Sequence, residues 1–374
     1  MNRLRVLLAA PGLGRQRRGA EAFAAECFAA LRDDPRLDLV LAKGGGTRRP
    51  RELRIRNLPR DSAWGIRLGT RLGGDGYTGE VWSFALALVP HVVRLRPHVV
   101  FVSDLLLARA LRRWRAVSHS RFRLLLRNNT NYAPPFTDVE FVQQLRPERF
   151  RQALAAGEAP TRQSLVPSGF FLADCPAETN PEGRRSLRRR LGLPEERPVV
   201  LSVGVLDAAV KGHDRLLHAC ARSEHAPFVV LLGARTDGTA ALEETARSAF
   251  ARPSAVLRTV EPAAVGDYYR CADVFASASL LEGFPRAFVE AAAHGLPCVV
   301  HDETFAREVL GEWGTYVDTL DEAALTEAVD AALASSPAPD AAARHDAMVA
   351  RYDWANLRES YVAMFRAAAS APIR

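Results

Sequence analysis

Short apolar runs alternate with longer amphipathic segments along most of the chain. The runs are rich in Val, Leu and Phe and have the length of buried strands, whereas the segments between them repeat apolar residues at helical spacing. The expected strands are 5–9, 37–41, 99–103, 123–126, 199–203, 228–232, 256–258 and 273–276. The expected helices are 20–31, 81–95, one that carries 109–114, one around 216–221, 240–250, 285–294 and 354–369. This alternation predicts an α/β fold with parallel sheets and ligands at the carboxyl ends of the strands.

The length of 374 residues favours two domains over one, because a single core rarely grows beyond roughly 250–300 residues. A linker is expected at 176–183, where Pro, Gly, Asn and Glu gather. We therefore predict a first domain over 1–177 and a second over 178–355. The Arg- and Gly-rich stretch 48–79 carries no clear periodicity, and its glycines at 73–79 predict a loop too flexible for the interior of an element.

Composition places the chain among soluble globular proteins, since 48% of its residues are hydrophobic and 25% are charged. The five cysteines are scattered, without C-x-x-C spacing, which favours reduced thiols and a cytoplasmic location. No apolar stretch reaches the roughly 18 residues of a membrane span. The apolar run 6–10 is too short for a signal peptide and is interpreted as the first strand.

The net charge of +7 comes from clustered arginines. Nucleic-acid binding is not expected, because the clusters contain few aromatic residues and no recognition motif. Most of the clusters are interpreted as solvated faces, with attraction to an anionic acceptor or a membrane surface as the alternative. The segment 112–123 is the predicted interfacial patch.

The segment 278–297 combines a loop, a short helix and two carboxylates. Pro285 suits the first helical position, and Gly295 suits the position just after the helix. The helix N-terminus offers backbone N–H groups to an anion such as a diphosphate. Glu282 in the loop and Glu290 in the second turn can bracket a ligand and accept hydrogen bonds from sugar hydroxyls. Together these features predict a nucleotide-sugar site.

A second motif lies at 198–217, where a buried strand leads into a loop with Gly204 and then into Lys211 and Gly212. Lys211 and Lys43 are the two lysines among the 50 basic residues. A compact ammonium on a flexible stem can reach a phosphate oxygen that a planar guanidinium does not fit. We therefore expect Lys211 to bind the donor diphosphate.

These two motifs resemble those of the retaining glycosyltransferases with the GT-B fold, specifically glycosyltransferase family 4 with its E-x7-E signature. Smaller similarities lie at 165–170 and at 269–275, which has the form Y-x-x-A-D-V-F. The resemblance is strong from about 165 to 318. It implies two Rossmann-like doubly wound domains facing a central cleft, the first binding the acceptor and the second the donor. It also implies a C-terminal helix, about 356–374, that crosses back to the first domain.

The resemblance assigns roles to the residues of the two motifs. The expected donor-binding residues are Gly204, Val205, Lys211, Glu282, Gly283, Phe284, Pro285, Arg286, Ala287 and Glu290. Lys211 and the amides of 284–287 would neutralise the phosphates, Glu282 would hold the sugar and Glu290 the ribose. Val205 stands where the family usually has an Arg, and Arg286 is expected to replace that Arg. Lys211, Glu282, Arg286 and Asn129 are the candidate catalytic residues.

The resemblance is weaker in the first domain. The loop after the first strand carries Gly12, Gly14, Gly19 and Glu21, whose last part resembles the family's G-G-x-E turn. It is expected to approach the diphosphate or the transferred sugar, with a plain strand–helix turn as the alternative. The family often carries a His where this chain has 127–132. Asn128 or Asn129 could hold a sugar hydroxyl there but cannot act as a base. The candidate acceptor residues are Asn128, Asn131 and Tyr132.

The expected activity is retaining transfer of a hexose-type sugar from a nucleotide-diphosphate sugar to a hydroxyl of a polar small molecule or saccharide. UDP is the expected nucleotide and GDP the alternative, and neither a metal nor a further cofactor is expected. The segment 48–80 and residues 128–132 are expected to set acceptor choice. The alternatives are a lipid-linked acceptor with peripheral contact at the inner face of the membrane, a nucleotide-sugar epimerase or hydrolase, and a catalytically silent binding homologue.

Overall fold

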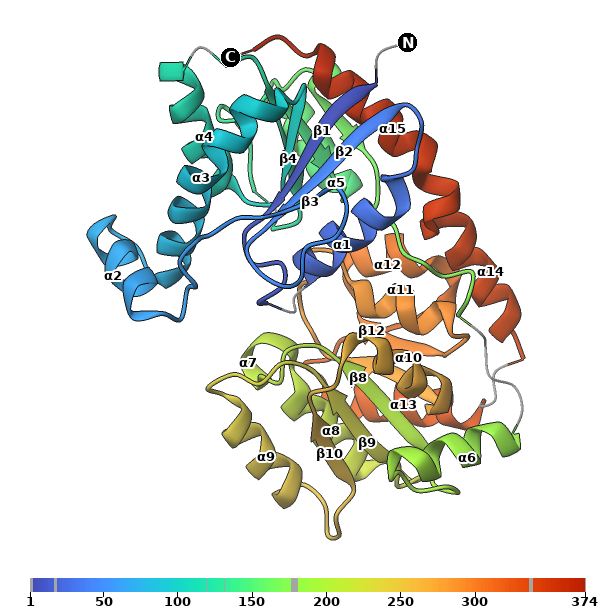
Figure 1. The fold of residues 1–374 in the computed structure, drawn as a ribbon. Coiled ribbons are helices and arrows are strands. Elements are labelled where there is room, and N and C mark those ends of the chain that lie inside the picture. The colour runs from blue at the N-terminus through green and yellow to red at the C-terminus, as the bar shows by residue number, and fades with distance from the viewer. Residues whose placement is uncertain are drawn as a thin grey trace. The chain divides into compact units, whose positions relative to one another are not determined.

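The computed structural model describes residues 3–16, 19–118, 120–130, 132–175, 181–335 and 339–373. The chain divides into two compact units. Unit 1 comprises Met1–Phe170 and Trp354–Arg374, and unit 2 comprises Phe171–Asp353. Each unit is a parallel sheet flanked by helices (Figure 1). The predicted fold class, two doubly wound α/β domains, is confirmed.

Unit 1 has a seven-stranded sheet of order β3-β2-β1-β4-β5-β6-β7, with every pair parallel. Its strands are β1 (Leu4–Ala10), β2 (Leu37–Lys43), β3 (Glu52–Arg54), β4 (Val99–Val102), β5 (Arg123–Asn128), β6 (Phe141–Gln144) and β7 (Gln163–Leu165). Its helices are α1 (Gly19–Leu31), α2 (Ala63–Arg71), α3 (Gly76–Leu95), α4 (Leu105–Ser118), α5 (Pro147–Ala155), the 3-10 turn η1 (Pro160–Arg162) and α15 (Trp354–Ser370).

Unit 2 has a six-stranded parallel sheet of order β10-β9-β8-β11-β12-β13. Its strands are β8 (Val199–Val203), β9 (Phe228–Leu232), β10 (Ala255–Arg258), β11 (Val274–Ser277), β12 (Cys298–His301) and β13 (Gly314–Val317). Its helices are α6 (Pro181–Leu191), α7 (Ala208–Lys211), α8 (His213–Arg222), α9 (Thr239–Ser248), α10 (Pro262–Cys271), α11 (Arg286–Ala293), α12 (Thr304–Leu310), η2 (Gly311–Trp313), α13 (Glu322–Ala334) and α14 (Ala341–Tyr352).

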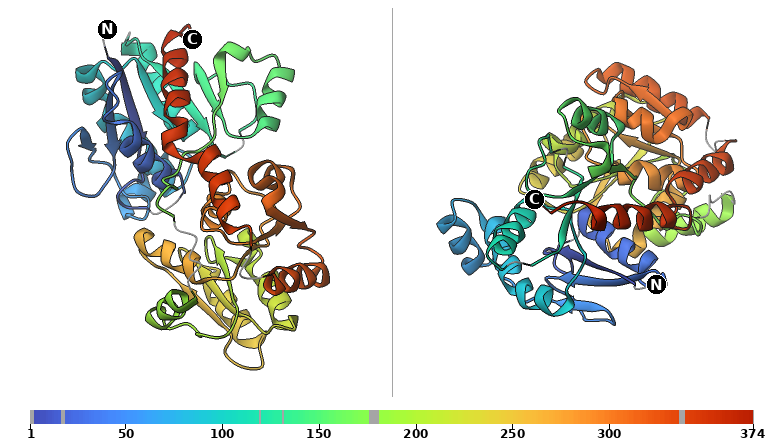
Figure 2. Two further views of the ribbon diagram at one scale, coloured as in Figure 1. Left: turned by 90° about the vertical axis from the view of Figure 1, so that its right-hand side faces the viewer. Right: turned by 90° about the horizontal axis from the view of Figure 1, so that it is seen from above.

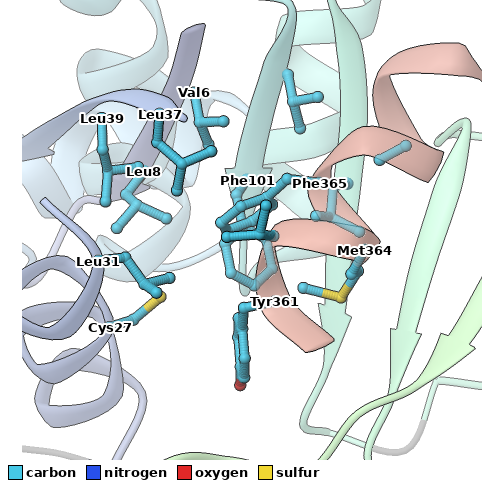
Figure 3. Packing of buried hydrophobic residues seen from close by; sticks show 14 of the residues in the cluster. Val6, Leu8, Cys27, Leu31, Leu37, Leu39, Phe101, Tyr361, Met364 and Phe365 are labelled. Atoms are coloured by element: carbon cyan, nitrogen blue, oxygen red, sulfur yellow. The ribbon is translucent and has the colours of Figure 1, made fainter. Parts of the chain in front are cut away.

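The C-terminal helix α15 belongs to the core of unit 1, as predicted. It contacts α1, β4 and β5 and covers one face of the sheet (Figures 1 and 2). Its Tyr361 and Phe365 are buried, and Phe365 packs edge-on against Phe101 of β4 at a centroid distance of 5.5 Å (Figure 3). Gly169 lies against the Trp354 ring, where any side chain would overlap it. Helix α15 thus completes a core that the first 170 residues leave open on this face.

Strand order reverses beside β1 in unit 1 and beside β8 in unit 2. In unit 1 the chain passes from β1 to β2 on one side and later to β4 on the other, and in unit 2 it passes from β8 to β9 and later to β11. Loops diverge at such a reversal and leave room for a ligand at the carboxyl ends of the strands. The loops after β1, β8 and β11 carry the motifs found in the sequence.

The expectation of a flexible loop over 73–79 is wrong, because α3 begins at Gly76. Asp75 caps the helix by accepting a hydrogen bond from the Thr78 amide at 3.0 Å. Gly76 and Gly79 are buried, and a Cβ atom on either would overlap a backbone carbonyl, that of Arg60 or of Gly65 respectively. These glycines therefore allow backbones to pack closely rather than to bend.

Strand β6 was missed because half of it is polar. Gln143 and Gln144 are fully buried, and each forms hydrogen bonds through its side-chain amide. Gln143 Nε2 donates to the Val166 carbonyl at 2.8 Å and to the Tyr361 hydroxyl at 3.0 Å. Gln144 accepts from Asn128 at 3.0 Å. These long-range hydrogen bonds offset the cost of burying the two amides, which no local pattern reveals.

Candidate functional site

The loop after β11 and helix α11 carry the two glutamates of the E-x7-E segment. The helix spans Arg286–Ala293, so Pro285 is its N-cap and not its first helical residue. The Arg286 amide donates to the Phe284 carbonyl at 2.9 Å and is therefore used within the turn rather than offered to a ligand. Gly295 follows the helix with φ at +78°, a left-handed conformation that suits glycine. The predicted stop at Gly295 is confirmed, and the predicted start is wrong by one residue.

Lys211 and Glu282 meet at the carboxyl ends of β8 and β11, which are neighbouring strands. The Lys211 ammonium lies 2.5 Å from Glu282 Oε1. The side chains are 19% and 17% exposed, so the pair is largely shielded but within reach of a ligand. The Lys211 stem crosses over Gly204, where a Cβ atom would lie 3.0 Å from Lys211 Cε. The structure thus brings together Gly204, Lys211 and Glu282.

Lys211 is the last residue of α7, and the caps of this short helix together with the start of α8 set its position. Asp207 caps α7 by accepting from the Ala209 amide at 3.0 Å, and Gly212 follows Lys211 with φ at +62°. The buried His213 ring lies with Nε2 3.1 Å from the Val205 carbonyl oxygen. Burial lowers the pKa of His213 to about 4, so the ring is neutral near pH 7 and Nε2 can donate to that carbonyl. His213 therefore fixes the turn that carries Val205.

Glu290 lies between a largely buried arginine and a buried hydroxyl. Its Oε1 is 3.3 Å from Arg286 on the same helix, and its Oε2 is 3.2 Å from the Tyr269 hydroxyl of α10. Tyr269 is fully buried and stacks on His294 at a centroid distance of 5.0 Å. Burial, followed by the Glu290 charge, raises the pKa of Tyr269, so its hydroxyl stays protonated and donates. Glu290 is thus held in place while it remains partly exposed.

Arg215 is a cation near this site that the sequence analysis did not single out. Its guanidinium donates to the Ala278 carbonyl at 2.7 Å and lies close to Gly212. It therefore ties the start of α8 to the loop that carries Glu282. The sequence feature that could have identified Arg215 is its position three residues after Gly212, in the first turn of an amphipathic helix.

The amino ends of β8 and β11 are fixed by Asp273, the Asp of the Y-x-x-A-D-V-F segment. It accepts from Arg184 at 2.7 Å, from Arg188 at 2.6 Å and from the Val199 amide at 2.7 Å. Both arginines come from α6. This basic run was interpreted as a solvated face, but two of its side chains bind Asp273. The anchoring sets the spacing of the two strands whose other ends carry Lys211 and Glu282.

In unit 1 the loop after β1 brings Glu21 against Gly12. A Cβ atom on Gly12 would overlap a Glu21 carboxylate oxygen and lie 3.3 Å from the Arg60 guanidinium. Gly14 packs on the backbone of Gly45, and Gly19 starts α1. The turn therefore places the Glu21 carboxylate at the carboxyl end of β1, near the guanidinium of Arg60, which itself donates to Glu80 at 2.5 and 2.8 Å.

The candidates after β5 have mainly internal partners. The buried Asn128 accepts from the Tyr132 amide at 2.7 Å and donates to the Tyr132 carbonyl at 3.0 Å, so it closes the turn instead of facing a ligand. In the orientation of the Asn129 side-chain amide that satisfies its hydrogen bonds, the nitrogen donates to the carbonyls of Ser103 and Arg127, both at 3.0 Å. Tyr132 packs against the apolar cluster of unit 1. Asn131 lies outside the described residues.

Comparison with known proteins supports a glycosyltransferase. Residues 183–346 match the family model described as "Glycosyl transferases group 1". A D-inositol 3-phosphate glycosyltransferase of Geodermatophilus obscurus is 32% identical over 57% of this chain and 49% of its own length. One of Xylanimonas cellulosilytica is 37% identical over 37% of this chain and 34% of its own. The chain thus matches between a third and a half of the length of these curated relatives.

Solved structures are similar over nearly the whole chain. Sucrose-phosphate synthase from Thermosynechococcus elongatus superposes with a TM-score of 0.77 at 18% identity, covering 97% of this chain and 98% of its own. Anabaena HepE in complex with UDP and glucose gives 0.76 at 15% identity, covering 97% and 99%. At such identities these likenesses establish the fold, which is GT-B.

Proposed function

We propose that this protein is a retaining glycosyltransferase that uses a nucleotide-diphosphate sugar as donor. The observation that carries the proposal is the meeting of Lys211 and Glu282 at the reversal of strand order in unit 2. A phosphate group can replace Glu282 as the partner of Lys211, which frees the carboxylate to accept hydrogen bonds from sugar hydroxyls. Glu290, held by the Tyr269 hydroxyl, would accept from the ribose hydroxyls.

The proposed chemistry needs positioning and charge stabilisation rather than a protein nucleophile. The bond from the sugar anomeric carbon to the leaving phosphate oxygen breaks, and a bond to the acceptor oxygen forms on the same face. The acceptor proton passes to the departing phosphate oxygen. Lys211 would stabilise the charge that develops on the diphosphate. The amide of Asn129 cannot accept that proton, so its role would be limited to holding a substrate.

The donor and acceptor classes follow from chemistry and from the relatives. HepE is known in complex with UDP and glucose, which supports a UDP-hexose, with a GDP-sugar as the alternative. The curated relatives are named for an inositol phosphate acceptor. A polar, anionic acceptor such as a phosphorylated polyol or saccharide agrees with the net charge of +7.

A ligand panel tests the function. The thermal midpoint of the full chain is measured with UDP, GDP and their common hexose donors, because a ligand that binds only the folded state raises the midpoint. The donor with the largest shift is then incubated with polyol phosphates and sugars, and the anomeric configuration of the product is assigned by NMR. Transfer with retention supports the proposal. Binding without transfer or hydrolysis indicates a silent homologue, and inversion contradicts the mechanism.

Transfer is expected to persist in excess EDTA. The proposed site assigns phosphate neutralisation to Lys211, so no divalent cation is needed to bridge the phosphates. The initial rate is measured before and after chelation, with a Mg²⁺-dependent transferase as a positive control for chelation. A rate that disappears with EDTA and returns with Mg²⁺ or Mn²⁺ would reject this account of the phosphate site.

Tyr269→Phe is expected to weaken UDP binding about fivefold, because the Glu290 carboxylate loses a buried hydrogen-bond donor of about 1 kcal/mol. Affinities are measured by calorimetry for UDP and for 2′,3′-dideoxy-UDP. If Tyr269 acts by orienting Glu290 toward the ribose, the substitution affects UDP and leaves the dideoxy analogue unchanged. Tyr268→Phe on the same helix is the matched control, because it removes a hydroxyl that accepts a hydrogen bond from Arg258 of β10. Equal losses for both ligands would indicate a merely structural role.

A further inference from the structure

Helix α2 is attached to unit 1 by its small residues and not by its large ones. Gly65 and Gly69 are buried, and a Cβ atom on either would overlap a backbone carbonyl, that of Pro59 or of Asp75. Ser62 caps the helix by accepting from the Gly65 amide at 3.0 Å. The helix is therefore firmly seated, and it projects from the side of the sheet (Figure 1). The side chains of Trp64 and Leu72 take little part in this packing and are exposed.

Those bulky side chains form an apolar stripe. Trp64, Leu68 and Leu72 recur every four residues from the start of α2 to its C-cap, which places them on one face. Trp64 is 68% exposed and Leu72 is 47% exposed. An exposed Trp beside leucines is costly in water and is typical of helices that lie in a membrane interface.

Arginines border the stripe. Arg67 and Arg71 lie next to it on the same helix, and the Arg67 guanidinium lies over the Trp64 ring, 5.7 Å from its centroid. The strand and arm before α2 carry further exposed arginines, namely Arg48, Arg49, Arg51, Arg54 and Arg56. The exposed acidic residues of the same stretch are Asp61 and Asp75. The stretch 48–75 thus carries more exposed arginines than exposed carboxylates, and Arg67 and Arg71 lie on the helix itself.

We propose that α2 is an interfacial helix that binds the surface of an anionic lipid bilayer. Trp64, Leu68 and Leu72 enter the boundary between headgroups and acyl chains, and Arg67 and Arg71 contact lipid phosphates. None of the described helices has the length and apolar character needed to cross a bilayer. The contact is thus peripheral, and α2 is a separate surface from the predicted patch at 112–123, which stays a prediction. It does not depend on the proposed catalytic function.

Co-sedimentation of the full chain with vesicles tests the proposal. Vesicles of phosphatidylcholine alone are compared with vesicles that also contain phosphatidylglycerol, at physiological salt. Binding is expected to the anionic vesicles. It should fall about tenfold or more in Trp64→Ser/Leu72→Ser, which removes the apolar anchor, and in Arg67→Glu/Arg71→Glu, which reverses the charge.

Matched controls separate this surface from net charge and general hydrophobicity. Arg358→Glu/Arg366→Glu changes two exposed arginines on α15 by the same charge, and Leu320→Ser removes an exposed leucine from unit 2. Both should bind like the parent chain. All variants should keep the parent's thermal midpoint, because the changed side chains are exposed. Equal loss in the controls, equal binding to neutral vesicles, or no binding by the parent would overturn the proposal.

Discussion

Replacing Lys211 with Ala is expected to weaken the binding of a nucleotide diphosphate by about ten- to a hundredfold. The substitution removes a charge-assisted hydrogen bond of roughly 1.5–3 kcal/mol to a phosphate oxygen. It also leaves the Glu282 carboxylate, now 2.5 Å from Lys211, without that ammonium, so that its charge would repel the incoming phosphate. Calorimetric titration of the full chain with UDP and GDP measures the effect.

The second lysine of the chain provides a matched control. Lys43 also lies 2.5 Å from a carboxylate, that of Glu52 in unit 1, and its pair is the more buried of the two. Lys43→Ala should lower stability and leave nucleotide affinity unchanged. Lys211→Ala should lower nucleotide affinity and leave stability unchanged. If Lys211→Ala binds both nucleotides like the parent chain, the assignment of the phosphate site is wrong.

Replacing Glu140 with Ala is expected to destabilise unit 1 by about 3–5 kcal/mol, the usual cost of leaving one charge of a buried ion pair without its partner. Arg115 donates to Glu140 at 2.6 and 2.8 Å, and the two side chains are 4% and 0% exposed. Glu140 also accepts from the Leu124 amide at 2.8 Å, so that β5 loses a contact as well. Urea denaturation, followed by circular dichroism, measures the loss.

A neighbouring exposed pair calibrates that measurement. Arg109 lies 2.8 Å from Asp138 but is about half exposed, so Arg109→Ala should cost less than about 1 kcal/mol. If Glu140→Ala loses no more unfolding free energy than Arg109→Ala, burial of the Arg115–Glu140 ion pair does not govern how much that pair contributes to stability.

The architecture could be predicted because it rests on local patterns. Each expected strand is found, and β8 and β9 are found with the predicted ends, since a buried parallel strand needs a continuous apolar run. The same applies to the stop of α11 at Gly295, which depends on the backbone freedom of one residue. The sequence also singled out Lys211, Glu282 and Glu290, because their residue types and spacing suit a nucleotide-sugar.

The partners of those residues could not be predicted in the same way. The pairing of Lys211 with Glu282 joins positions 71 residues apart, and Tyr269 lies 21 residues from Glu290. Such distances are set by the order of strands in the sheet, which no periodicity encodes. The role of Arg215 at the Ala278 carbonyl has the same origin.

Polar residues in the interior show the limit most clearly. Gln143 and Arg115 resemble surface residues in any local pattern, and Asn128 resembles a ligand-binding amide. Each is buried with a hydrogen bond to a group farther along the chain: Tyr361 for Gln143, Glu140 for Arg115 and Gln144 for Asn128. The sequence by itself determined where the eight expected strands form, because a continuous apolar run depends on neighbours along the chain. Only the tertiary structure decided which polar side chains face a ligand and which stabilise the core, because burying a polar group is favourable only when its partner is brought to it.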